Sequence, residues 1–76
     1  MTSSRSKQLV VCIDNDAFQA SLERRKIYVA IPDRSAEAHD LIRIVDESGD
    51  DYLYPRALFR AISLPESLRK VLLSAA

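Results

Sequence analysis

Four carboxylates lie within six residues on either side of the chain's only glycine, Gly49. They are Asp46, Glu47, Asp50 and Asp51. Hard cations such as calcium prefer oxygen ligands, so this cluster is a candidate cation site. We expect instead a solvated hairpin tip whose charges protect a sheet edge. A second acidic run, 14–16, begins like a calcium-binding loop, but Gln19 and Arg25 stand where that loop needs glycine and glutamate. The sequence therefore predicts no metal site.

His39 and Cys12 are the only histidine and the only cysteine, which limits the catalytic chemistry the chain can offer. Neither has a second histidine or cysteine with which to hold zinc, and no serine or cysteine stands in a recognisable nucleophile motif. We expect His39 at a surface helix end, and Cys12 as a buried, inert thiol inside the apolar run QLVVCI. The sequence predicts no catalytic residue, no cofactor site and no enzymatic activity.

The one basic run is Arg24, Arg25 and Lys26. Side chains of this kind could hold phosphates or an acidic partner. We expect a solvated loop, paired in part with Glu23 or with the acidic hairpin. Eleven basic residues balance eleven acidic ones, whereas a nucleic-acid binder of this size is more often basic. Nucleic-acid binding is thus the alternative function and not the leading one.

Three tyrosines, Tyr28, Tyr52 and Tyr54, are the remaining candidates for a contact surface. Tyr52 and Tyr54 are two residues apart on a predicted strand, so they share one face of the sheet. If that face is outward, the rings form an amphipathic surface of the kind enriched at protein interfaces. If it is inward, the rings fill a small core. The sequence leaves both possibilities open.

Alternating apolar residues predict the strands that must position these side chains. The first strand begins at Lys7 and runs to Ile13, and the others are 26–31, 41–46, 51–54 and 60–63. Phe18 and Leu22 are expected to anchor the long first loop, 14–25, to the core. A helical turn is predicted over 33–40, with Asp33 or Ser35 as its cap. Gly49 is predicted at a left-handed turn position, and a single helical turn is predicted after Pro55. On the fourth strand we expect Leu53 to point inward.

A C-terminal helix over 64–75 is predicted from a capping box formed by Ser63 and Glu66. Its apolar stripe has helical spacing and consists of Leu68, Val71, Leu72 and Ala75. Leu68 and Leu72 are therefore candidate interaction residues. The helix either packs across an open end of its own barrel, which we favour, or docks on another copy of the chain.

The length of 76 residues predicts one domain, 7–76, preceded by a flexible tail, 1–6. Apolar residues make up 47% and charged residues 29%, too apolar for disorder. A single cysteine rules out an intrachain disulfide and favours a reducing, intracellular setting. The first apolar run is too short for a signal-peptide core or a membrane span, so we expect no membrane partner and a cytoplasmic location.

Five short strands, one tight hairpin and a helical turn before the last strand predict a mainly β fold, a small, partly open barrel. The segment YLYPRALFRAI resembles the end of a Src-homology-3 domain. The whole of 9–62 resembles a group of small bacterial proteins with this barrel, through VCIDN, KIYVAI and RIVDESGDDYLYP. The resemblance implies a five-stranded Src-homology-3-like barrel with a C-terminal helix. Peptide-binding members present a tryptophan to proline-rich ligands, and this chain has none, so that activity is not expected.

These observations together predict a non-enzymatic interaction module that contacts a protein partner. Self-association through the C-terminal helix is a further possibility. The alternative is a weak nucleic-acid or ribosome-associated module that uses the basic run. Fold alone does not decide between them, because function resides in sites and not in folds.

Overall fold

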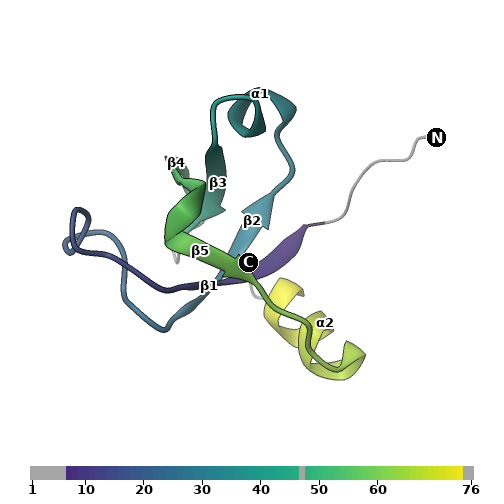
Figure 1. The fold of residues 1–76 in the computed structure, drawn as a ribbon. Helices are drawn as coiled ribbons and strands as arrows, with labels where there is room; N and C mark the ends of the chain where they lie inside the picture. The colour runs from purple at the N-terminus through teal and green to yellow at the C-terminus, as the bar shows by residue number, and fades with distance from the viewer. Residues whose placement is uncertain (1–6, 47, 75–76) are drawn as a thin grey trace.

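A computed structural model describes residues 7–46 and 48–74, which form one five-stranded sheet with three short helical elements (Figure 1). Their order is β1 (Gln8–Cys12), β2 (Ile27–Ile31), α1 (Arg34–Glu37), β3 (Leu41–Val45), β4 (Asp51–Pro55), the 3-10 turn η1 (Arg56–Leu58), β5 (Phe59–Ala61) and α2 (Glu66–Ser74). The predicted tail 1–6, Glu47 of the acidic cluster and Ala75 of the helical stripe lie outside the described residues. The prediction of a mainly β chain with a C-terminal helix is confirmed.

The strand order is β4-β3-β2-β1-β5, and every neighbouring pair is antiparallel. The first four strands follow one another as a meander, and β5 returns to pair with β1. Within the described residues β4 and β5 are the two edges, so the sheet is open. The last strand begins and ends earlier than predicted because η1 finishes at Leu58.

The core lies on one face of the sheet and receives side chains from all five strands. Strand alternation sends them to that face, and the buried cluster comprises Val10, Cys12, Leu22, Tyr28, Ala30, Ile44, Tyr54 and Phe59. The rings of Tyr54 on β4 and Phe59 on β5 lie with their centroids 6.2 Å apart. Side chains of the two edge strands therefore meet, which requires the sheet to curl around its own core.

The opposite face of the sheet is also apolar in its middle. Leu9 and Val29 pair across β1 and β2, and both are buried. α2 lies beside the start of β1 (Figure 1), where the Arg69 guanidinium donates a hydrogen bond to the Lys7 carbonyl oxygen at 3.1 Å. Ile27, the first residue of β2, lies on that same face and is exposed. The chain thus buries apolar residues on both sides of a single sheet.

The long first loop is held to the core by the two residues predicted to anchor it. Leu22 is only 1% exposed, and the half-buried Phe18 meets the Tyr54 ring edge-on at 5.2 Å. The Asn15 side-chain amide donates to the Leu22 carbonyl oxygen at 2.8 Å, which ties the two ends of the loop together. This prediction is confirmed.

Turn and cap residues act as the sequence indicates. Asp33 caps α1, because its carboxylate accepts a hydrogen bond from the Ala36 N–H at 3.1 Å. Gly49 has φ +92°, the left-handed region that glycine adopts without steric cost. Pro55 is the last residue of β4 and is followed directly by η1. The predictions for Gly49 and Pro55 are confirmed, and of the two predicted cap residues, Asp33 and Ser35, it is Asp33 that caps α1.

The inward position predicted for Leu53 is wrong. Leu53 is 43% exposed, whereas Tyr54 is 7% exposed and belongs to the core. The register explains the difference: Tyr52 pairs with Ile44, and Ile44 lies in the core cluster. Even-numbered residues of β4 therefore face inward, and Leu53 must face outward.

Candidate functional site

The three candidate tyrosines separate into two core residues and one surface residue. Tyr28 and Tyr54 are buried, and Tyr28 meets the Phe59 ring edge-on at 6.0 Å. The Tyr28 hydroxyl oxygen accepts a hydrogen bond from the Glu23 N–H at 2.8 Å, so its polar end is used inside the chain. The shared face of Tyr52 and Tyr54 is thus the inward one. Only Tyr52, at 48% exposed, extends past the core and can reach another molecule.

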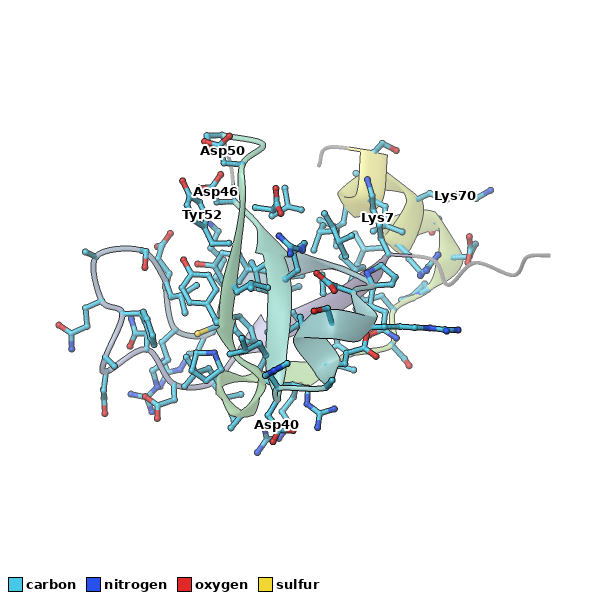
Figure 2. The ribbon with its side chains drawn as sticks, turned by 90° about the horizontal axis from the view of Figure 1, so that it is seen from above. Lys7, Asp40, Asp46, Asp50, Tyr52 and Lys70 are labelled. Atoms are coloured by element: carbon cyan, nitrogen blue, oxygen red, sulfur yellow. The ribbon has the colours of Figure 1, made fainter. Side chains whose placement is uncertain are left out.

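Tyr52 lies beside the acidic hairpin, as Figure 2 shows with Asp46 and Asp50 next to it at one end of the molecule. The negative charges of Asp50 and then Asp46 raise the pKa of the Tyr52 hydroxyl above its usual value, since they disfavour a phenolate. Tyr52 consequently stays a neutral hydrogen-bonding group at physiological pH. It offers an amphipathic contact and not a nucleophile.

The acidic hairpin is held by hydrogen bonds of its own. The Ser48 hydroxyl donates to the Asp46 carboxylate at 2.5 Å, and the Ser48 N–H donates to the same oxygen at 2.9 Å. The Ser48 hydroxyl bond is the main reason that the pKa of Asp46 lies below its usual value. Among residues 7–46 and 48–74, no group of three histidine, cysteine, aspartate or glutamate side chains is placed to hold a metal.

The basic run presents two exposed arginines and one lysine that is used locally. Arg24 and Arg25 are exposed, and Arg25 has a left-handed backbone fixed by its N–H bond to the Cys12 carbonyl at 2.7 Å. Lys26 pairs with Glu23 at 3.2 Å and lies 5.3 Å from the Tyr28 ring centroid. The predicted pairing with Glu23 is confirmed for Lys26.

His39 and Cys12 are placed as predicted. His39 is exposed just after α1, with Nδ1 3.0 Å from the Ser35 carbonyl oxygen. Cys12 is completely buried, and its thiol lies 3.4 Å from the Asp14 carbonyl oxygen. Among the residues that the structure describes, neither side chain lies in a group of three metal-ligating residues.

The face of α2 that packs on the rest of the chain differs from the face that its apolar stripe predicts. Its half-buried residues are Arg69, Leu72 and Leu73, and none of its described residues is fully buried. Leu68 and Val71 are 44% and 64% exposed. The two candidate leucines are therefore divided, Leu72 toward the chain and Leu68 toward solvent. Two large apolar side chains on one helix remain in water.

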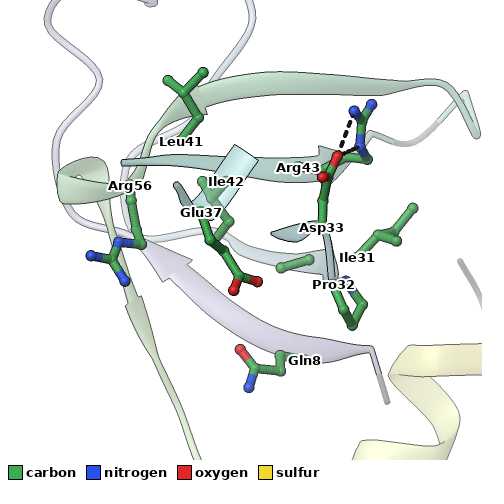
Figure 3. Close-up of a pocket in the computed structure, with 10 residues that line it drawn as sticks. Gln8, Ile31, Pro32, Asp33, Glu37, Leu41, Ile42, Arg43 and Arg56 are labelled. Atoms are coloured by element: carbon green, nitrogen blue, oxygen red, sulfur yellow. Dashed lines mark hydrogen bonds and ion pairs between the residues drawn. The ribbon is translucent and has the colours of Figure 1, made fainter. Parts of the chain in front are cut away.

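A pocket of about 250 Å³ lies between α1 and the strands around it (Figure 3). Its lining includes Gln8 of β1, Glu37 of α1, Ile42 of β3 and Arg56 of η1, with charges of both signs. Sequence inspection missed it, because its residues come from separate elements and share no motif.

Arg43 forms one wall of this pocket and joins three elements. Its guanidinium contacts the Asp33 carboxylate at 2.7 Å and the Asp51 carboxylate at 2.5 Å. Hydrogen bonds, first from the Ala36 N–H and then from Arg43, lower the pKa of Asp33 below its usual value. Asp33 and Asp51 are thus employed in linking α1, β3 and β4, and no spacing rule in the sequence indicates this link.

Comparison with known proteins finds no matching family model, no matching curated protein and no matching solved structure. Within the described part of the chain, no helix has the length and apolar character needed to cross a membrane.

Proposed function

We propose that the chain is a small, non-enzymatic interaction module, a Src-homology-3-like barrel that contacts a protein partner through α2. The observation that carries this proposal is the exposure of Leu68 and Val71 on a helix with no fully buried described residue. Removing apolar surface from water is favourable by roughly 25 cal/mol per Å². A partner with an apolar groove would bury both side chains, a recurring mode of helix recognition.

The barrel part of the proposal is supported by the topology. β5 returns to pair with β1 after a 3-10 turn that follows Pro55, and all five strands send side chains into one core cluster. A single sheet that encloses its own core has the curvature of a partly open barrel. The core would then hold Tyr28 and Tyr54, and the helix would be an appendage outside it.

The test is affinity purification from the native host with tagged wild-type chain and a tagged Val71→Asp variant. Val71 is exposed, so the substitution should leave folding intact while placing a charge in the contact. Lys70→Gln is the matched control, because it changes the net charge by the same amount at an exposed position of α2 that lies about 100° around the helix from Val71. We expect a partner to be retained by wild type and Lys70→Gln and lost by Val71→Asp. Equal retention by all three chains would refute the role of α2, and the absence of any partner would refute the function.

Nucleic-acid binding is the second candidate, favoured by the exposure of Arg24 and Arg25 on the first loop. Two phosphate contacts would give weak binding that falls steeply with salt. Titration of single-stranded RNA and DNA at low and high salt, with Arg24→Ala/Arg25→Ala, tests it. Arg34→Ala is the control, since Arg34 is exposed on α1. If the wild-type chain shows no salt-sensitive binding, this candidate is removed.

A further inference from the structure

β4 is an edge strand. Hydrogen bonds at the two ends of the ladder that it forms with β3 show which of its main-chain groups face β3. The Asp46 N–H donates to the Asp50 carbonyl at 2.9 Å, and the Arg56 N–H donates to the Asp40 carbonyl at 2.9 Å. In an antiparallel ladder every second residue pair is hydrogen-bonded. Counting in twos from either end gives the same set of bonded residues within β4, namely Tyr52 and Tyr54.

The odd-numbered residues of β4 therefore turn their main-chain groups toward the open edge. Asp51 and Leu53 each offer an N–H and a carbonyl, and Pro55 offers a carbonyl only, since proline has no N–H. The side chains of Asp51, Leu53 and Pro55 are exposed, so this edge is accessible. It is a short template for one more strand.

At the other edge of the sheet, one edge-facing carbonyl of β5 is covered by a side chain of the same strand. The Arg60 guanidinium donates to the Phe59 carbonyl at 2.9 Å and to the Ala57 carbonyl at 3.1 Å. Among the described residues, no side chain caps the edge-facing groups of Leu53 in this way. The two edges thus differ: β5 has three residues and a capped carbonyl, whereas β4 has five residues and is the longer, less covered edge.

We propose that β4 pairs antiparallel with β4 of a second copy of the chain, with Leu53 opposite Leu53 across a two-fold axis. In that register each Leu53 N–H donates to the Leu53 carbonyl of the other copy. Each Asp51 N–H donates to the Pro55 carbonyl of the other copy. Pro55 has no N–H to donate to the Asp51 carbonyl of the other copy, and that carbonyl is solvated by water instead. The proline is therefore no obstacle to this pairing.

The same register is complementary in charge. Asp50 lies opposite Arg56 of the other copy, and the two-fold axis makes this pair twice. Both residues are exposed, and within 7–46 and 48–74 the Arg56 guanidinium is held by a surface pair with Asp40 at 3.3 Å, which it can exchange. Leu53 packs against Leu53 on the outer face, while Tyr52 lies opposite Tyr54 of the other copy. A self-complementary edge favours a second copy over an unrelated strand.

The first test measures mass by sedimentation equilibrium on the full chain from about 10 µM to about 1 mM, where a dimer must grow with concentration. We expect wild type to move toward twice the monomer mass. Leu53→Pro should stay monomeric, because proline removes the N–H of residue 53, which faces the open edge. It removes no hydrogen bond between β4 and β3. Leu53→Ala, which keeps the N–H, should still dimerise. A wild-type chain that is monomeric throughout, or Leu53→Pro that dimerises like wild type, overturns the proposal.

The second test reverses the charges and does not depend on how well Leu53→Pro folds. Asp50→Arg and Arg56→Asp each place like charges opposite one another in the homodimer, and each should weaken dimerisation about tenfold. An equimolar mixture of the two variants restores opposite charges at both pairs and should dimerise like wild type. Failure of the mixture to recover places the contact elsewhere.

This inference does not rest on the proposed role of α2. Val71→Asp should leave the β4 dimer unchanged while it abolishes partner capture. Loss of dimerisation in Val71→Asp, with Leu53→Pro unaffected, would move the self-contact to the helix.

Discussion

Replacing Leu22 by alanine tests whether the first loop is part of the folding unit or an appendage to it. Leu22 lies in the loop and not in a strand, yet it is only 1% exposed and belongs to the core cluster. A fully buried leucine cut to alanine costs about 2–5 kcal/mol, depending on how far the cavity collapses. We expect about 3 kcal/mol, because strands on several sides restrict that collapse.

That cost is large for a chain of this size. At about 0.05–0.15 kcal/mol per residue, 76 residues give a total stability of about 4–11 kcal/mol. The melting temperature should fall by about 10–20 °C. Urea unfolding followed by tyrosine fluorescence and far-ultraviolet circular dichroism measures it, since the chain has no tryptophan.

Leu53→Ala is the matched control, because it is the same chemical change at a position that is 43% exposed. It should lower the free energy of unfolding by about 1 kcal/mol or less, because Leu53 buries less apolar area on folding than Leu22 does. If Leu22→Ala costs no more than Leu53→Ala, the loop is not packed on the core and the reasoning is refuted.

Three further predictions concern single interactions. Tyr28→Phe should cost about 1 kcal/mol in urea unfolding, because the Glu23 N–H loses its acceptor, and an unchanged midpoint would contradict that bond. Gly49→Ala should also cost about 1 kcal/mol, from backbone strain at φ +92° and not from a clash, since nothing lies within 4 Å of the added methyl group. The pKa of Asp46 is lowered in the folded chain, so its stabilising contribution is present above the unfolded pKa of about 4 and is lost as pH falls through the folded value. Wild type and Asp46→Asn should therefore differ in stability at pH 7, and the difference should shrink as the pH is lowered below the unfolded pKa.

Much of the local structure follows from the sequence, because it depends on residues close together in the chain. Gly49 at the hairpin, Asp33 at the helix cap and Pro55 before the 3-10 turn each act through their own backbone or a neighbour within three residues. Alternation likewise indicates that Tyr52 and Tyr54 share a face. It does not indicate which face, because both sides of β4 carry apolar residues.

Tertiary structure decides that question through register. The hairpin sets Tyr52 opposite Ile44, and Ile44 is buried, so Leu53 turns outward. A shift of one residue would have reversed every side chain of the strand. The face of α2 is also decided by the folded chain: Arg69, Leu72 and Leu73 are its half-buried residues, and Arg69 contacts Lys7.

The residues with metal-ligating, nucleophilic or charged side chains show the same division between what the sequence indicates and what the fold decides. From the sequence alone, a single histidine and a single cysteine limit the zinc ligands and the nucleophile–base pairs that the chain can offer. Only the folded chain brings Arg43 between Asp33 and Asp51, gathers the pocket residues from separate elements, and leaves β4 as the longer, less covered edge. The reason is physical: residue type and spacing govern local backbone preference, whereas long-range pairing is fixed by the register and curvature of the whole sheet.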